Sequence, residues 1–190
     1  GTNGELIIGN REFLLCGAGA AGPALEGGSV KTGMRAVPGA VERVELKDGH
    51  FHLLTIGQKP PQGICGSGIV DMLAQLFLNG WISIQGKFLP EKSPLIHLEE
   101  EEYCVTYAPG LNFYQSDIDE FLKTKAAAVT MIYYMLELTG LPADEIGHFY
   151  MAGAFGAHIS KESAVTIGMY PDVEREKLVP VGNSSLTGAQ

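Results

Sequence analysis

An alternation of predicted helices and strands in residues 116–190 restricts the fold of this 190-residue chain more than any other feature of its sequence. Apolar residues recur at helical spacing between Ser116, a candidate N-cap, and Gly140, and they predict one long buried helix. The elements predicted after it are a strand over 148–152, a helix over 161–168, a strand over 178–181 and a last helix near the final residues. Helices that alternate with strands in this way are typical of α/β proteins.

Paired strands dominate the predicted structure of the first half. The expected hairpins join runs 5–8 and 11–16 around Gly9-Asn10, and runs 41–47 and 51–56 around Asp48-Gly49. A helix is predicted over 66–78, because its apolar residues keep the 3.6-residue period. The remaining predictions are loop over 17–40, strands over 81–89 and 103–107, and an exposed acidic loop over 99–102. We therefore expect an α/β fold in which helices flank a mixed sheet.

The chain is acidic, with 13 basic and 22 acidic residues and a formal net charge of −9. Nucleic acids are bound by basic surfaces, so this composition argues against a nucleic-acid partner. The longest apolar stretch, Ala126 to Met135, is too short to span a bilayer and contains Thr130. No secretory signal opens the sequence. We expect a cytoplasmic protein with no membrane partner.

The cysteine and histidine pattern assigns no catalytic or metal site. Three cysteines, Cys16, Cys65 and Cys104, are odd in number and far apart, which argues against a disulfide framework, a zinc site or an iron–sulfur cluster within these residues. Cys65 at a helix start is either a reactive thiol or a buried, inert one. His158 is either a surface or packing residue or a catalytic base. No nucleophile and base stand in a recognisable arrangement, so the catalytic residues stay unknown.

Glycine accounts for 25 of the 190 residues, about twice its usual share. The segment Gly17 to Gly22 matches the dinucleotide pattern G-x-G-x-x-G, and Glu42 follows 20 residues beyond it. However, Pro23 to Glu26 run directly into Gly27-Gly28, which leaves no room for the helix that a dinucleotide fold requires. The P-loop pattern does not occur.

Three further segments could meet a nucleotide, and each has a structural alternative. Gly66-Ser67-Gly68 either caps and packs a helix or turns its start toward a nucleotide or a partner lobe. Gly153-Ala154-Phe155-Gly156 is either a strand-to-helix turn or bare backbone against which an adenine or ribose lies. Asn183-Ser184-Ser185 either caps the last helix or belongs to the same site.

A set of motifs in a fixed order identifies a family. The segments are Gly1–Glu5, Ala21–Gly27, Gly33–Ala36, Gly63–Ile69, Met151–Gly156 and Gly182–Ala189. With them, the chain resembles the C-terminal ATPase domain of the reductive activators of corrinoid enzymes over its whole length. That domain belongs to the superfamily of actin, sugar kinases and heat-shock chaperone ATPases.

The resemblance implies a ribonuclease-H-like (actin-like ATPase) lobe, with residues 1–190 as a single domain. It would be the second of two lobes that clamp ATP or ADP with Mg²⁺. The first lobe and an N-terminal [2Fe–2S] domain are absent from this sequence. The nucleotide-binding residues that it implies, together with the helix start at 66–68, are Gly1, Thr2, Asn3 and Gly4 (phosphate hairpin), Gly66, Ser67 and Gly68, Gly153, Ala154, Phe155 and Gly156 (adenosine motif), and Asn183 and Ser184. The hairpin's aspartate would precede Gly1, and we expect a further strand before that position.

The resemblance also implies the activity of the whole protein. In this family an iron–sulfur cluster passes an electron to a corrinoid protein or corrinoid methyltransferase of anaerobes that has stalled as Co(II), and ATP drives its return to Co(I). The partners implied are that corrinoid protein and the first lobe, and the lobe alone would be inactive. Two alternatives stay open: a lobe of a small-molecule kinase of the same superfamily, and an interaction module without catalysis.

Overall fold

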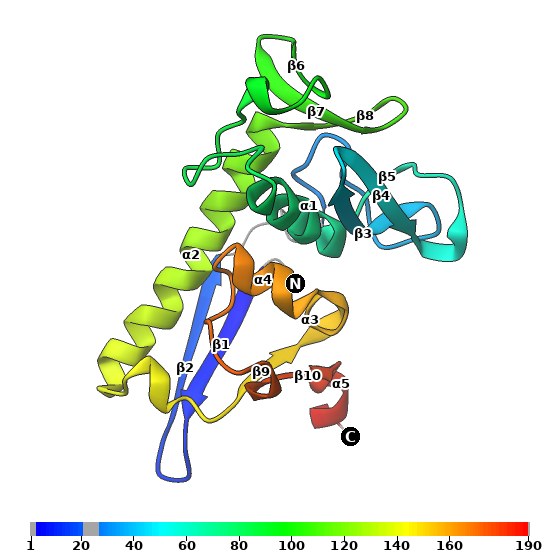
Figure 1. The fold of residues 1–190 in the computed structure, drawn as a ribbon. Helices are drawn as coiled ribbons and strands as arrows, with labels where there is room; N and C mark the ends of the chain where they lie inside the picture. Colours follow the sequence, from blue (N-terminus) through cyan, green and yellow to red (C-terminus); the bar gives the residue numbers. More distant parts are fainter. Residues whose placement is uncertain (1–2, 21–26, 190) are drawn as a thin grey trace.

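The computed structural model describes residues 3–20 and 27–189 (Figure 1). The strands are β1 (Asn3–Gly9), β2 (Leu14–Ala20), β3 (Ala40–Lys47), β4 (His50–Thr55), β5 (Gly63–Ile64), β6 (Ile96–Glu99), β7 (Glu102–Ala108), β8 (Leu111–Tyr114), β9 (Phe149–Ala152) and β10 (Leu178–Gly182). The α-helices are α1 (Gly66–Leu78), α2 (Gln115–Thr139), α3 (Gly153–His158), α4 (Lys161–Thr166) and α5 (Ser184–Ala189). One half holds β3 to β8 with α1, the other holds β1, β2, β9 and β10 with α3 to α5, and α2 runs beside both (Figure 1).

The strands form four small sheets within the described residues. β1 pairs antiparallel with β2, β9 pairs parallel with β10, and β6, β7 and β8 form an antiparallel meander. In the remaining sheet β3 lies antiparallel to β4 and parallel to β5. The α/β class and the mixed pairing are therefore confirmed, whereas the ribonuclease-H-like arrangement stays a prediction.

One hydrophobic core joins the two halves. Helix α1 packs along β3 and carries the fully buried Ile69 and Met72, which belong to the same cluster as Phe121 of α2. Met151 of β9 and Leu178 of β10 extend this cluster into the other half. Buried contacts therefore run without interruption from one half to the other.

The long helix has the predicted extent but a different start and a narrower buried face. Its N-cap is Tyr114 and not Ser116, because the Asp117 carboxylate accepts hydrogen bonds from the Tyr114 and Lys31 N–H groups, both at 2.9 Å. Gly140 ends it with a left-handed φ of 67°. The prediction of one continuous buried stripe is wrong at Ala126 and Tyr133, which are exposed. The second half of α2 contacts the β1–β2 hairpin on one side, so only part of its surface is covered.

Three other predictions of local structure need correction. Residues 81–89 form a tight loop, in which a single bridge joins Ile82 to Phe88, because Gly86 at a φ of 74° turns the chain. Strand β2 begins at Leu14 and continues through residues 17–20, which were predicted as loop. The predicted acidic loop is a hairpin turn: Glu99 ends β6 and Glu102 begins β7. In the last two cases pairing between strands overrides local composition.

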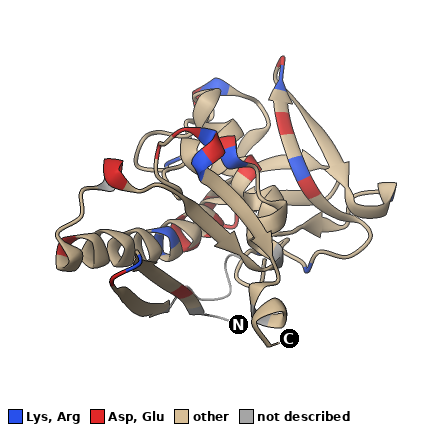
Figure 2. Ribbon diagram, turned by 90° about the horizontal axis from the view of Figure 1, so that it is seen from below, with Lys and Arg blue, Asp and Glu red and all other residues tan. Residues whose placement is uncertain are grey.

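Charged residues are interspersed rather than segregated. Acidic and basic positions lie near one another along the ribbon (Figure 2), and β3 alone carries Glu42, Arg43, Glu45 and Lys47. Among the residues described, no helix combines the length and apolarity needed to cross a membrane.

Candidate functional site

The parallel strands β9 and β10 bring two of the predicted segments together. Ala152 pairs with Gly182, so Gly153 and Asn183 leave the pair side by side at the carboxyl ends of their strands. Ligands of open α/β sheets bind at such carboxyl ends. We call this place, formed by residues 153–156 and 183–184, the β9–β10 edge.

The two glycines at this edge have different roles. Residues 153–156 form the first turn of helix α3, where the sequence predicted a strand-to-helix turn or bare backbone. A Cβ on Gly156 would lie 3.1 Å from the Met151 side chain, and Phe155 packs against the core. Packing therefore explains these two residues. Gly153, in contrast, has a φ of 90° and open space around the position of a Cβ, so its backbone is accessible.

Asn183 caps helix α5, which is the structural alternative considered for this segment. Its side-chain Oδ1 accepts a hydrogen bond from the Leu186 N–H at 3.0 Å, and Ser184 is the exposed first residue of α5. An asparagine at this position is a favoured helix N-cap. The binding role of Asn183 and Ser184 stays a prediction.

The predicted phosphate hairpin is seen only in part. Gly1 and Thr2 lie outside the described residues. Asn3 and Gly4 are strand residues, paired with Ala20 and Gly19, where a turn was predicted. The antiparallel pairing of β1 continues to its first described residue, and this extended backbone leaves no turn at Asn3 and Gly4.

Gly66, Ser67 and Gly68 are buried where α1 meets β3. A Cβ on Gly68 would lie 2.3 Å from the Val41 carbonyl oxygen, closer than any real contact. The packing alternative thus accounts for this segment, and its binding role stays a prediction. Cys65, beside it, is buried and its thiol donates to the Val41 carbonyl at 3.3 Å, which corresponds to the inert alternative.

The dinucleotide alternative is wrong. Gly17 and Gly19 lie within β2, opposite Leu6 and Gly4, where that fingerprint requires a turn into a helix. A Cβ on Gly17 would lie 2.8 Å from the Met135 sulfur, so this glycine allows β2 to approach α2. Residues 21–26 of the pattern lie outside the described residues. His158 ends α3 and is exposed, as its surface alternative states.

A cavity of about 170 Å³ is lined by residues of the β1–β2 hairpin, α2 and β9. Its walls include Leu6 of β1, Ile132 of α2 and Phe149 of β9, and Tyr170 closes one side. Of the predicted site residues only Gly4 lines it. The lining is mainly apolar, so the cavity suits side chains rather than phosphates.

The buried hydroxyl of Tyr170 should make the free energy of unfolding decrease at alkaline pH. Burial raises the pKa of its hydroxyl to about 12, against about 10 in the unfolded chain. Because the folded pKa is the higher one, this group's contribution to the free energy of unfolding is fully present below pH 10 and is lost between pH 10 and 12, by up to about 3 kcal/mol.

We expect the free energy of unfolding of Tyr170→Phe to fall less than that of the wild type between pH 9 and 12, measured from urea midpoints. Exposed Tyr150 supplies the control Tyr150→Phe, which should follow the wild type; equal slopes for all three proteins would contradict the prediction.

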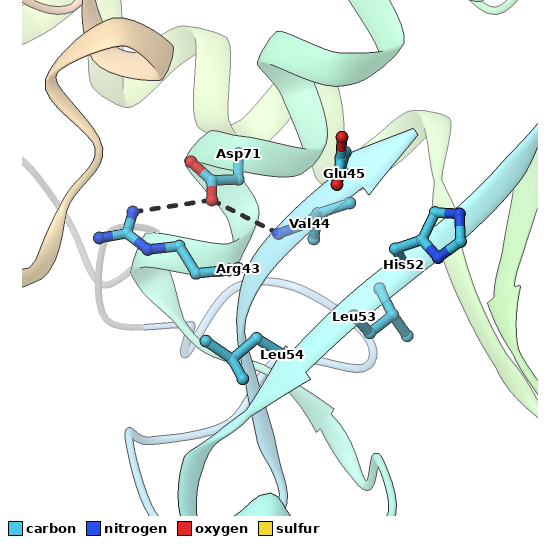
Figure 3. A pocket seen from close by; sticks show the side chains of 7 residues that line it. All are labelled: Arg43, Val44, Glu45, His52, Leu53, Leu54 and Asp71. Atoms are coloured by element: carbon cyan, nitrogen blue, oxygen red, sulfur yellow. Dashed lines mark hydrogen bonds and ion pairs between the residues drawn. The ribbon is translucent and has the colours of Figure 1, made fainter. Parts of the chain in front are cut away.

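A second cavity, of about 350 Å³, lies beside β3, β4 and α1 (Figure 3). Arg43 and Asp71 meet on its wall, with Nη1 and Oδ2 3.6 Å apart, and the same Oδ2 accepts from the Val44 N–H at 3.4 Å. Asp71 Oδ1 and Arg43 Nη1 are buried without a hydrogen-bond partner in the structure. The pair links α1 to β3. The only signal for this pair in the sequence is an aspartate, Asp71, within the apolar run of α1, and the sequence does not show that Arg43 lies beside it.

Comparison with known proteins shows to which family this chain belongs. A family model described as "C-terminal domain of RACo the ASKHA domain" matches residues 1–190. The chain belongs to this family. The family prediction from the sequence motifs is thus confirmed, and with it the assignment to an actin-like ATPase fold.

Relatives of this ASKHA domain are corrinoid activators. The corrinoid activation enzyme RamQ of Eubacterium limosum is 34% identical over 206 residues, which cover 100% of this chain and 35% of RamQ. The Co(II) methylated amine-specific corrinoid protein reductase of Methanosarcina barkeri is 24% identical, over 100% of this chain and 37% of the reductase. A solved structure titled reductive activator for corrinoid, iron-sulfur protein superposes with a TM-score of 0.91 at 38% identity, covering 100% of this chain and 32% of that one. The chain thus spans about a third of the length of the relatives it matches.

Proposed function

We propose that this domain is the nucleotide-binding lobe of an ATP-dependent reductive activator that returns a Co(II) corrinoid protein to Co(I). The nucleotide would be ATP or ADP with Mg²⁺, held between this domain and a first lobe elsewhere in the protein. The electron would come from a [2Fe–2S] cluster in another domain, and would reach a corrinoid protein or corrinoid methyltransferase as partner.

The β9–β10 edge is the observation that carries this proposal. Two strands end side by side there, and Gly153 exposes backbone beside Asn183 and Ser184. Among the described residues 152–156 and 182–184 there is no carboxylate. A Mg²⁺ ion at this edge would therefore need carboxylate ligands from another part of the protein.

ATP would act by changing the equilibrium between lobe arrangements. A ligand shifts a conformational equilibrium only by its difference in affinity for the two states. If ATP binds both lobes in a closed state, closure is favoured in proportion to the contacts made only there. Contacts from the β9–β10 edge would supply only part of that difference, so the lobe alone should bind nucleotide weakly.

The proposal is tested with Gly153→Ala in the full-length protein. A Cβ at this position projects into the open space beside the edge, and we expect the dissociation constant for Mg-ADP to rise at least about tenfold, or about 1.4 kcal/mol. Isothermal titration calorimetry measures this. Gly49→Ala is the matched control, because Gly49 also has a positive φ (76°) and open space, in the turn between β3 and β4.

The same experiment separates the competing functions. The activator requires ATP-dependent conversion of Co(II) to Co(I), followed by the absorbance of the corrinoid, and Gly153→Ala should slow it while Gly49→Ala does not. Phosphorylation of a small molecule without corrinoid reduction would favour the kinase. Absence of nucleotide binding by the wild type would favour the interaction module. Equal affinities of the two variants would remove Gly153 from the site.

A further inference from the structure

The β6–β7–β8 sheet gathers metal-binding side chains on one face. His97 of β6 pairs with Cys104 of β7, and Cys104 pairs with Tyr114 of β8. Directly paired residues stand on the same face of a sheet, so these three side chains form a row. Glu99, two residues after His97 on β6, faces the same way. The side chains of a histidine, a cysteine and a glutamate thus lie close together on this face of the sheet.

The separations of their donor atoms suit a single ion. The candidate ligand atoms of His97, Glu99 and Cys104 all lie within 4.8 Å of one another. Cys104 Sγ is 3.5 Å from His97 Nε2 and 3.6 Å from Glu99 Oε2. In a tetrahedral zinc site, with Zn–S about 2.3 Å and Zn–N or Zn–O about 2.0–2.1 Å, the sulfur lies about 3.5–3.6 Å from the other donors. The protein therefore already holds the sulfur at the separation that zinc needs.

Neighbouring groups orient two of the three side chains. His97 Nδ1 lies 3.2 Å from the Leu95 carbonyl oxygen, and a proton donated there leaves the Nε2 lone pair for a metal. The Tyr114 hydroxyl at 2.9 Å and the Asn112 amide at 2.6 Å both donate to Glu99 Oε2, the oxygen that faces Cys104, and they hold the carboxylate in place beside the thiol. Such outer contacts are typical of metal ligands, because they fix ligand orientation before the ion arrives.

We propose that His97, Glu99 and Cys104 form a zinc site on this sheet, separate from the β9–β10 edge. Imidazole, thiolate and carboxylate are the donors that zinc takes in proteins. Three protein ligands leave a fourth position for water or for a donor from outside the described residues. On binding, zinc replaces the thiol proton of Cys104, which passes to solvent, and the ion joins β6 to β7.

The site was invisible to spacing rules applied to the sequence. Cys104 is the only cysteine of β7, and the other two proposed ligands come from β6, the preceding strand of the hairpin. The available signal was the His97-x-Glu99 pattern, which places two ligands on one strand face. The expectation of no metal site rested on the spacing of cysteines and histidines along the chain. The third ligand, Cys104, is brought beside His97 by the register of β6 against β7.

The test measures zinc in the full-length protein by methods that do not respond to an iron–sulfur cluster. Chelator-stripped protein is given one equivalent of Zn²⁺, desalted, and assayed for zinc by mass spectrometry and by zinc K-edge X-ray absorption. We expect one zinc per chain, with one sulfur at about 2.3 Å and nitrogen or oxygen donors at about 2.0–2.1 Å. His97→Gln and Cys104→Ser should each weaken binding at least about 100-fold, and Tyr114→Phe about tenfold.

Matched controls separate the site from adventitious binding. His50→Gln changes a histidine whose Nδ1 also lies near a backbone carbonyl, 2.8 Å away. Cys16→Ser changes an exposed cysteine that lies outside the row. Both should keep wild-type zinc affinity. Because Cys104 is fully buried, His97→Gln supplies the decision if Cys104→Ser does not fold. Wild-type protein without bound zinc, zinc without a sulfur ligand, or unchanged affinity in His97→Gln would each overturn the proposal.

Discussion

Gly68→Ala is expected to lower the free energy of unfolding by about 3 kcal/mol, although alanine normally stabilises a helix relative to glycine by roughly 0.5–1 kcal/mol. The reason is the contact between α1 and β3. A Cβ at this position would lie 2.3 Å from the Val41 carbonyl oxygen and 2.8 Å from Ile64 Cγ1. Neither backbone can withdraw without opening the buried contact. Urea unfolding followed by circular dichroism measures the change.

Gly147→Ala is the control for this substitution. Gly147 lies before β9 with open space around it and no positive φ, so alanine there should leave the unfolding midpoint nearly unchanged. A second measurement separates packing from binding at residues 66–68. If Gly68→Ala were as stable as the wild type but bound Mg-ADP more weakly in the full-length protein, the binding alternative for this segment would replace the packing one.

Phe121→Ala is expected to cost about 3–5 kcal/mol, a large part of the total stability of a domain of this size. Phe121 is fully buried on α2, in the cluster that joins both halves of the molecule. Its removal leaves a cavity that neighbouring side chains from several elements cannot fill together. We expect the denaturant midpoint to fall sharply while the slope of the transition is kept.

Tyr134→Ala on the same helix provides the comparison. Tyr134 is 56% exposed, so its truncation should change stability by less than about 0.5 kcal/mol. Similar losses for the two variants would show that the outer face of α2 is covered in the free protein, contrary to the structure.

Local signals in the sequence were sufficient for most elements. The hairpins around Gly9-Asn10 and Asp48-Gly49, helix α1 and the extent of α2 were all predicted, because turn residues and periodicity act between near neighbours in the chain. The strands β9 and β10 were also predicted. Residues 81–89 and 153–156 were not, since their conformations depend on pairing with, or packing against, other segments.

The candidate site divides in the same way. The sequence singled out residues 153–156 and 183–185 as candidates, and the parallel pairing of β9 with β10 places Gly153 and Asn183 side by side at the strand ends. Which glycines are free to meet a ligand could not be predicted, because Gly68, Gly156 and Gly153 look alike in sequence. Their neighbours distinguish them: Val41 covers the first, Met151 covers the second, and open space surrounds the third.

By itself, the sequence determined the family, the α/β class and the order of elements, because motifs, periodicity and turns are properties of consecutive residues. Only the tertiary structure decided which surfaces are buried and which side chains meet. His97 and Cys104 illustrate the difference, since seven positions separate them in the chain and β-sheet register makes them neighbours. Register and packing depend on interactions between segments distant in sequence, and a linear pattern does not contain those distances.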